Sequence, residues 1–344
     1  MLRVKIYLLN FLLILAFISS LFPQVDRVAQ SGMTFLSIDI GARAGGMGGS
    51  YICMDGDANA LFWNPAGISS VRKFDMVVNT TSWLAEMKEH AIGIVYGTDR
   101  YGALGMSFIT MDNPAVRITQ FTTGEDWIDL GYQEVVKQYA VGLAYAKEIT
   151  NSFAVGGQMK WVHEDLGTYD YVDRMATEVV DGLERPLRVN NWEAKKDVLV
   201  YEFGTFYYTG YRDLRLALAI RNFAPRTRYQ LEYFELPLTF SLGMAMNILS
   251  TLMPVDKKHV LTLSINAVQP RDYSERLQLG GEYWFQDIFA IRAGYKFNYD
   301  LENFSAGIGL KKNLGSTAGR IDYAYTSISD VFNSVHRFSF GISF

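Results

Sequence analysis

Residues 335–344 of the chain read VHRFSFGISF. One side of this stretch is apolar and the other is small or polar, because Phe338, Phe340, Ile342 and Phe344 alternate with Ser339, Gly341 and Ser343. A period of two residues is the period of a β-strand. Strands of about ten residues with one apolar face are typical of barrels that span an outer membrane, where that face meets lipid. The stretch therefore predicts a lipid-facing strand.

An aromatic residue occupies the last position of this predicted strand. An amphipathic strand that ends in Phe resembles the signal by which the outer-membrane assembly machinery recognises its substrates. We therefore expect a four-residue assembly signal, with that machinery and outer-membrane lipid as partners. The four residues are Phe338, Phe340, Ile342 and Phe344.

The same alternation recurs upstream. In residues 289–297, Phe, Ile, Ala, Tyr and Phe face one way, and Ala, Arg, Gly and Lys face the other. A soluble β-sandwich also alternates, but Arg, Lys and many Gly residues would suit a dry core poorly. We predict an all-β fold, a transmembrane up-and-down antiparallel barrel of about fourteen strands. The strands are expected at residues 74–83, 89–97, 101–110, 137–147, 153–163, 197–208, 214–222, 237–247, 259–268, 275–285, 288–297, 303–311, 318–327 and 335–344.

The lengths of the predicted connections support this assignment. The long ones (111–136, 164–196 and 223–236) fall at one end of the barrel. The tight ones (98–100, 148–152, 209–213 and 286–287) fall at the other, where only 248–258 is longer. Outer-membrane barrels carry long loops outside and short turns on the periplasmic side. We therefore expect the first strand to rise from the periplasm and the last to return to it.

Composition limits the class of protein. The 344 residues are 49% hydrophobic and carry a formal net charge of −4, which leaves no surplus of Lys and Arg for a nucleic-acid partner. Residues 1–24 predict a secretory signal peptide without a clear cleavage site, with Arg3 and Lys5 before an apolar run. After it, no uncharged apolar run reaches the ~18 residues of a spanning helix, so a closed barrel is the remaining membrane solution. We expect the outer membrane of a two-membrane bacterium, with residues 25–70 as an N-terminal segment and 71–344 as the barrel.

The N-terminal segment is rich in glycine. Residues 33–67 read MTFLSIDIGARAGGMGGSYICMDGDANALFWNPAG. Glycine permits positive φ and close backbone approach. A nucleotide-binding reading fails, because the third glycine of GxGxxG would fall at Tyr51 and no strand–helix context surrounds the motif.

These residues resemble the opening signature of the PorV/PorQ family, within the wider FadL-like outer-membrane barrels. The likeness lies in GARAGGMGG at 41–49 and in DANALFWNPAG at 57–67. The sequence departs at Ser50, where the family usually has an acidic or small residue after the second glycine pair. The resemblance implies a fourteen-stranded barrel whose N-terminal segment folds into the lumen as a plug. The expected plug residues are Gly41, Arg43, Gly45, Gly46, Met47, Gly48, Gly49, Asp55, Asp57, Asn64, Pro65 and Gly67.

The residues themselves agree with a plug. Asn64-Pro65 marks a turn, and a lumenal Arg43 needs carboxylate partners, for which Asp55 and Asp57 are candidates. An alternative is that the glycines only form a tightly packed first segment that stabilises the barrel.

Nothing in the sequence indicates an enzyme, a cofactor or a metal site. No GxSxG, HExxH or paired-cysteine site is present. His163, Glu164 and Asp165 form the one dense acid–base group, at the start of a long connection, where polar neighbours are usually just solvated.

Two functions remain open. The PorV/PorQ resemblance implies a component of a type IX-like secretion system, with secretion proteins or cargo as partners. The alternative is a FadL-like conduit for small hydrophobic ligands, for which Met47, Phe62 and Trp63 are candidate lining residues. Packing would explain those three residues equally well.

Overall fold

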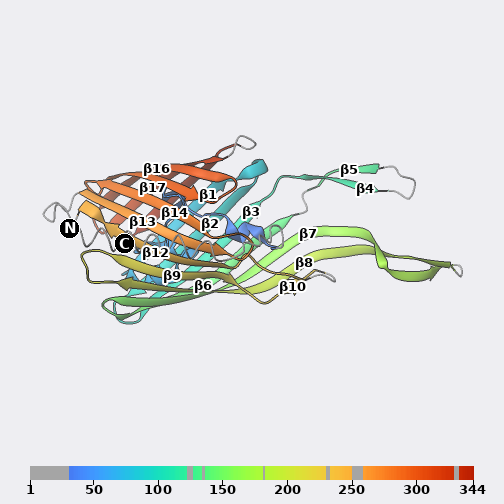
Figure 1. The fold of residues 1–344 in the computed structure, drawn as a ribbon, viewed down its shortest axis with the longest axis horizontal. Coiled ribbons are helices and arrows are strands. Elements are labelled where there is room, and N and C mark those ends of the chain that lie inside the picture. The colour runs from blue at the N-terminus through green and yellow to red at the C-terminus, as the bar shows by residue number, and fades with distance from the viewer. Residues whose placement is uncertain are drawn as a thin grey trace, which may run out of the picture.

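A computed structural model describes residues 31–121, 127–133, 136–180, 183–229, 233–249, 259–328 and 333–344 (Figure 1). The predicted signal peptide, residues 1–24, lies outside these ranges. Within the described part of the chain, no helix is both long and apolar enough to cross a membrane.

Fourteen antiparallel strands close into one barrel, as the sequence predicts. In order around the wall they are β1 (Phe74–Ser82), β18 (Val335–Ser343), β17 (Thr317–Ile328), β16 (Glu302–Leu314), β15 (Phe289–Phe297), β14 (Arg276–Phe285), β13 (His259–Pro270), β12 (Thr239–Asn247), β9 (Arg215–Phe223), β8 (Leu183–Tyr208), β7 (Phe153–Val180), β6 (Lys137–Thr150), β3 (Gly102–Asp112) and β2 (Lys88–Thr98). Each strand pairs with its sequence neighbours in the wall, and β1 pairs with β18 to complete the closure.

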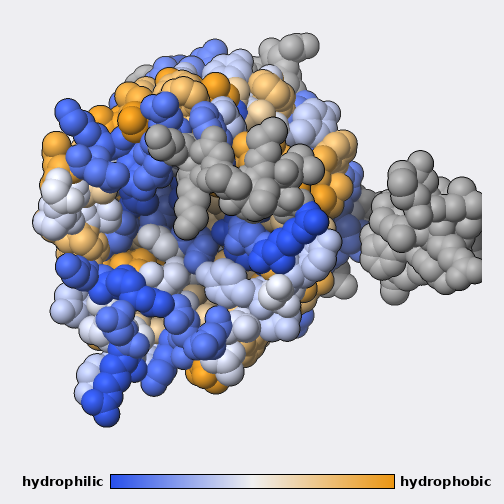
Figure 2. Space-filling model, turned by 90° about the vertical axis from the view of Figure 1, so that its left-hand side faces the viewer, coloured by the Kyte–Doolittle hydropathy of each residue, from blue (hydrophilic) through white to orange (hydrophobic). Residues whose placement is uncertain are grey.

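The burial pattern of the strands is the reverse of that in a soluble sandwich. In β15, Arg292 and Lys296 are buried at 1% and 3% exposure, whereas Ile291 and Tyr295 are 51% and 42% exposed. Polar side chains therefore face the lumen and apolar ones face outward, which suits a lipid environment. The end view in Figure 2 agrees, because hydrophilic residues occupy much of the end face and hydrophobic ones lie along its outline.

The two ends of the barrel differ. At one end, called here the short-turn end, β2–β3, β6–β7 and β14–β15 are joined by a few residues each. At the opposite end, called the long-hairpin end, the expected loops are partly wrong. Segment 111–136 contains the hairpin β4 (Val116–Phe121) and β5 (Trp127–Gln133), and 223–236 contains the short pair β10 (Thr227–Arg228) and β11 (Tyr233–Phe234).

The largest difference from the predicted loops concerns 164–196, which continues β7 and β8 as paired strands of 28 and 26 residues. About 9–11 residues suffice for one crossing of a membrane. The far part of this hairpin therefore projects beyond the barrel, on the same side as β4 and β5 (Figure 1). In this far part, main-chain pairing between β7 and β8 continues the hairpin, although the residues no longer alternate as lipid-facing strands do.

Residues 31–71 precede the barrel and form short helical turns rather than strands. They are η1 (Thr34–Ser37), α2 (Ala42–Gly46), η2 (Ala58–Phe62) and η3 (Pro65–Ser70); a further turn, η4 (Leu84–Glu86), joins β1 to β2. The helix α2 contacts β15 to β18, whereas η3 contacts β6, β7 and β8 across the barrel. The segment is almost wholly buried and touches both sides of the lumen. Its residues and the lumenal faces of the strands form the core.

Candidate functional site

Arg43 joins the N-terminal segment to the β14 wall. Its Nε and one terminal nitrogen donate to both carboxylate oxygens of Glu282, at 2.8 and 2.6 Å, in a two-bond fork. The other terminal nitrogen donates to Asp57 at 2.8 Å. Glu282 also accepts from Arg292 at 2.6 Å, and Arg292 reaches Asp322 at 2.7 Å. Charged pairs thus connect the segment with β14, β15 and β17.

Asp57 lies at a second node of this network. Arg320 of β17 contacts Asp57 at 3.2 Å and Asp75 at 2.7 Å, and the Tyr51 hydroxyl donates to Asp57 at 3.0 Å. Burial alone would raise the pKa of the Asp57 carboxyl. The Arg320 and Arg43 guanidinium groups outweigh burial and hold that pKa below its usual value of 3.8. Asp57 also caps η2 by accepting from the Asn59 amide at 3.0 Å.

A third node lies nearer the long-hairpin end. Lys296 contacts Asp39 at 2.7 Å and Glu302 at 2.5 Å, and Arg337 contacts Glu302 at 3.2 Å. Arg337 also donates to the main-chain oxygen of Asp39 at 3.0 Å. Apart from an ion pair of Asp55 with Arg215 of β9, the charged contacts of the segment with the wall therefore run along β14 to β18, with β1 at the end of the row.

The opposite side of the segment is apolar. Leu61, Phe62 and Ile68 are buried at 0–2% exposure, and Leu61 and Ile68 face Gly105 of β3. Phe62 and Leu61 also lie against Gly93 of β2. Small residues in the wall therefore make room for large residues of the segment.

The two remaining candidate lining residues for an apolar cavity are also packed. Met47 is fully buried and Trp63 is 2% exposed, with the Trp63 indole donating to the Ile40 main-chain oxygen at 3.0 Å. Met47, Phe62 and Trp63 line none of three cavities among the described residues, which are presented below. Packing accounts for these side chains.

The glycines of the 41–49 motif lie where the chain runs closest to the wall. Gly48 has φ of +62°, and a Cβ there would lie 2.9 Å from the Tyr295 main-chain nitrogen. Facing it, Gly294 leaves no room for a Cβ because the Gly48 main chain occupies that space. Gly46 meets Gly307 in the same way at 3.1 Å. Gly45 lies against Arg337, Gly49 against Gln278, and Gly41 precedes α2.

The second half of the motif adjoins β8 and β9. The Asn64 side chain caps η3 by accepting from Ala66 at 3.1 Å and donates to main-chain oxygens of Ile52 and Thr205. Pro65 begins η3, and Gly67 lies against Ala60 and Met54. The expected pairing of Asp55 with Arg43 is wrong, because Asp55 contacts Arg215 at 3.3 Å and Tyr208 instead. Asp55 faces the other wall of the lumen, so Arg43 cannot reach it.

The expected assembly-signal residues lie on the outer face of the closing strand. Phe338, Phe340 and Phe344 are 54%, 49% and 54% exposed, and Ile342 is half-buried. The Phe344 amide donates to the Phe74 main-chain oxygen at 2.9 Å, and the two rings meet edge to face at 5.7 Å.

The acid–base group at 163–165 is not assembled into one site. His163 contacts Asp197 at 2.9 Å, whereas Glu164 is buried and accepts from Gln138 at 2.5 Å. Asp165 lies 3.8 Å from Lys195. Consecutive strand residues point to opposite faces, which separates the three side chains. The described residues also contain no group of three or more His, Cys, Asp or Glu arranged to hold a metal ion.

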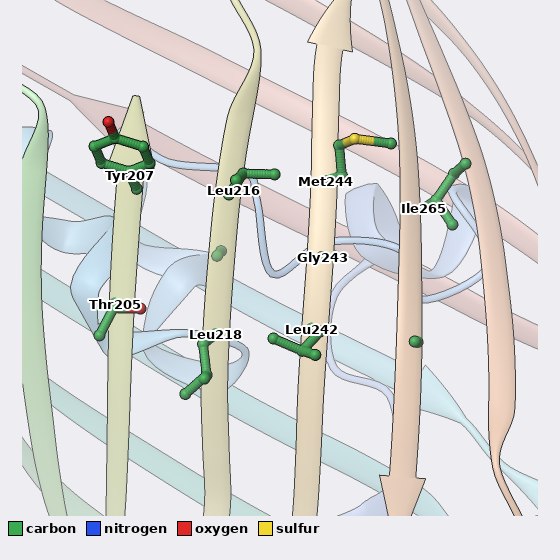
Figure 3. Close-up of a pocket in the computed structure, with 10 residues that line it drawn as sticks. Thr205, Tyr207, Leu216, Leu218, Leu242, Gly243, Met244 and Ile265 are labelled. Atoms are coloured by element: carbon green, nitrogen blue, oxygen red, sulfur yellow. The ribbon is translucent and has the colours of Figure 1, made fainter. Parts of the chain in front are cut away.

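An apolar recess of about 430 Å³ lies in the outer wall over β8, β9, β12 and β13. Figure 3 shows its side chains on the near side of these strands, with the N-terminal segment behind them. Leu216, Leu242, Met244 and Ile265 border it and are 39–50% exposed. Gly243 has no side chain to thicken the wall at this point, and a Cβ there would lie 2.6 Å from Ile52 of the segment.

Two polar cavities lie at the two ends of the lumen. The cavity at the long-hairpin end has about 270 Å³, and Asp39, Lys296 and Tyr299 are among its lining residues. The cavity at the short-turn end has about 260 Å³ and is lined in part by Arg43, Asp75 and Arg320. The N-terminal segment lies between them.

Several charged residues of the lumen were not found from the sequence. They are Asp75, Glu282, Arg320 and Asp322, which lie on the lumenal faces of predicted strands. The usable signal was their position, because a charge on the small or polar side of a lipid-facing strand must be lumenal and needs a partner. The partner itself could not be predicted from the sequence, since Arg43 and Glu282 are 239 residues apart in the chain.

Comparison with known proteins adds to this geometry. No family model matches the chain, and no curated protein matches its sequence. Solved structures do match. A Pseudomonas putida toluene transporter, TodX, aligns with a TM-score of 0.54 and 12% identity, over 87% of this chain and 96% of its own. The Ralstonia pickettii toluene transporter TbuX aligns with 0.53 and 12%, over 88% and 96%.

A FadL homologue of Pseudomonas aeruginosa aligns with a TM-score of 0.53 and 11% identity, over 94% of this chain and 98% of its own. The fold is that of the FadL-like outer-membrane barrels. This supports the wider group in the predicted resemblance and a multi-pass barrel in the outer membrane. None of the three solved structures is PorV or PorQ: two are toluene transporters and the third is a FadL homologue.

Proposed function

We propose that this FadL-like barrel conducts small apolar molecules across the outer membrane, with residues 31–71 as the plug that closes its lumen. Two of the similar structures are toluene transporters, which suggests the substrate class. At 12% identity that likeness extends to the fold alone. The argument for this chain therefore rests on its own wall.

The observation that carries the proposal is the apolar recess over β8, β9, β12 and β13. Its side chains are those of Leu, Met, Ile and Ala, with Thr205 and Tyr207 at one side. A solute that buries apolar area there gains roughly 25 cal/mol per Å². The wall behind the recess is thin, because Gly243 and Ala217 present at most a methyl group to the lumen. Ile52 of the plug lies directly behind Gly243.

In this proposal the plug keeps the lumen closed. Its largely apolar half lies beside β2 to β9, and its charged half is tied to β14 to β18. The polar cavities at the two ends are separated by this layer. An apolar molecule is therefore expected to pass between bilayer and lumen at the recess, beside Ile52, when the plug shifts.

Filling the recess tests the route. Leu218→Trp and Met244→Trp place indoles on the lipid-facing side, where aromatic residues are well tolerated. We expect each to lower uptake of radiolabelled toluene by cells several-fold, with unchanged amounts of folded barrel. Ile308→Trp is the matched control, because Ile308 is a 50% exposed, lipid-facing residue of β16 outside the recess. Equal uptake by all three variants and by the native chain would rule out the recess as a route.

The secretion-associated function is not favoured. The comparisons support the transporter-like fold and give no support to a type IX component.

A further inference from the structure

The cavity at the long-hairpin end is built differently from the apolar recess. It lies inside the barrel mouth, between the start of the plug and the β13–β14 and β15–β16 connections. Three aromatic side chains, Trp83, Tyr273 and Tyr299, line it together with several charged groups. Its volume of about 270 Å³ suits a molecule of a few heavy atoms to about one ring.

Arg276 is the first unusual residue of this cavity. Its guanidinium lies 4.0 Å from the Tyr273 ring centre and 4.4 Å from that of Tyr299, so the two rings hold it in place. It forms no ion pair with any carboxylate of the described residues, and its Nε is buried without a hydrogen-bond acceptor. A buried donor without an acceptor is costly, and an anion bound beside the guanidinium would offset that cost.

Arg221 borders the same cavity and is in a similar state. Its guanidinium lies 5.0 Å from the Trp63 ring centre and donates once, to the Phe62 main-chain oxygen at 3.0 Å. Its Nε is also buried without an acceptor in the part of the chain that the structure describes. A charge-assisted acceptor is therefore missing at two guanidinium groups that line one cavity.

The other cations of the lining already have carboxylate partners. Lys296 is paired with Asp39 and Glu302, and Arg271 contacts Glu235 at 3.1 Å. Two further carboxylates, Asp272 and Asp300, border the cavity on the connections beyond the strands. They would repel a second negative charge on a ligand. The lining thus favours one anionic head over a multiply charged anion.

We infer that this cavity binds a small aromatic monoanion, with a carboxylate between Arg221 and Arg276 and a ring against Tyr273, Tyr299 or Trp83. The inference goes beyond the conduction of apolar molecules, because the ligand is charged and its site is lumenal rather than lipid-facing. It rests on the lining of one cavity and does not require toluene to pass through the barrel.

Equilibrium binding to the full-length barrel in a non-ionic detergent tests the inference. By isothermal titration calorimetry we expect benzoate to bind, and benzylamine, toluene and inorganic phosphate to bind at least tenfold more weakly. Arg276→Gln and Arg221→Gln should each weaken benzoate binding by about ten- to a hundredfold, as expected for a lost charge-assisted hydrogen bond. Arg271→Gln is the matched control and should keep native affinity, because Arg271 lines the same cavity but is already paired with Glu235.

The ligand series on the native barrel keeps the test valid even where a variant fails to fold. Benzylamine or phosphate binding as tightly as benzoate would overturn the inference, as would no binding of benzoate at all. An equal loss in Arg271→Gln and Arg276→Gln would reduce the effect to general charge and also overturn it. Toluene uptake by the Arg276→Gln variant separates the two proposals, because we expect it to be unchanged.

Discussion

At the scale of single residues, Arg43 connects the proposed plug to the β14 wall through a two-bond fork on Glu282. Arg43→Ala would leave the carboxylates of Glu282 and Asp57 with fewer partners in a buried site. Removing one partner of a buried ion pair typically costs 3–5 kcal/mol, and we expect about 3 kcal/mol because the Arg43 side chain is 16% exposed.

The only cysteine of the chain reports this change. Cys53 lies fully buried in the plug, and burial raises the pKa of its thiol to about 12. It should therefore label slowly in the native barrel and much faster in Arg43→Ala, while heat-modified mobility stays native. Lys311→Ala, which removes an exposed pair with Asp287 between wall residues, is the control and should label like the native chain.

Acid should loosen the plug through Asp57. Because the guanidinium groups hold its folded pKa below 3.8, the ionised carboxylate stabilises the plug fully above that pH. The contribution is lost as the pH falls further, through the folded pKa. Cys53 should thus stay protected from an acid-active disulfide reagent between pH 7 and about 4, and become reactive below. A loss of protection already at pH 6 would contradict this assignment.

What the sequence could supply at this scale was residue type and face. The alternation predicted that Arg292 and Lys296 lie opposite the lipid face, and they do. Asp57 was a reasonable partner for Arg43 because it is near in sequence, but so was Asp55, which binds elsewhere. Side-chain pairing depends on which strand lies beside the plug in the folded barrel. The local sequence around Arg43 does not determine which strand that is.

At the scale of elements, two glycine variants separate the effect of the close approach between the glycine motif and β15 from the effect of backbone strain. Gly48→Val forces both a strained positive φ and a collision with the Tyr295 and Gly294 main chain. Gly210 also has positive φ, of +76°, but a Cβ there meets nothing within 4 Å. We expect Gly48→Val to raise the entry of small solutes in liposome swelling while the barrel still forms, and Gly210→Val to behave as native. Equal permeability would reduce the plug to a tether.

The closing strand is expected to control assembly. Phe344 joins β18 to the start of β1 through one hydrogen bond and one ring contact. Phe344→Lys should therefore strongly reduce the heat-modifiable band in outer-membrane fractions. Phe285→Lys changes a similarly exposed residue at the same end, on β14, and should assemble nearly normally. Comparable yields of the two variants would argue against a terminal signal.

Strand positions were predictable because lipid selects every second residue. Predicted and observed bounds for β1, β12, β15 and β18 differ by no more than two residues at either end. The far part of β7 and β8 was not predictable, since a hairpin in water needs no apolar face on one side. The short helical turns of the plug were not predictable for another reason, because their conformation depends on packing against the surrounding barrel wall.

At the scale of the whole molecule, the long β7–β8 hairpin should identify the outer surface of the cell. Trypsin added to intact cells is expected to cut at Arg174 or Arg188, leaving two fragments that stay together in the membrane. Lys147 and Arg212, at the short-turn end, should be cut only after the outer membrane is permeabilised. Cleavage in the reverse order would invert the orientation.

The division of the plug's partners sets an order of events during biogenesis. The plug is synthesised before any strand, yet the Ala42 amide is bound by Ser339 and the Asp39 main-chain oxygen by Arg337. Both partners lie on β18, which is made last. We therefore expect the plug to pack fully only when the final strand is in place, and to be open to periplasmic proteases until then. Protection of the plug from proteases should therefore appear only at the end of barrel assembly.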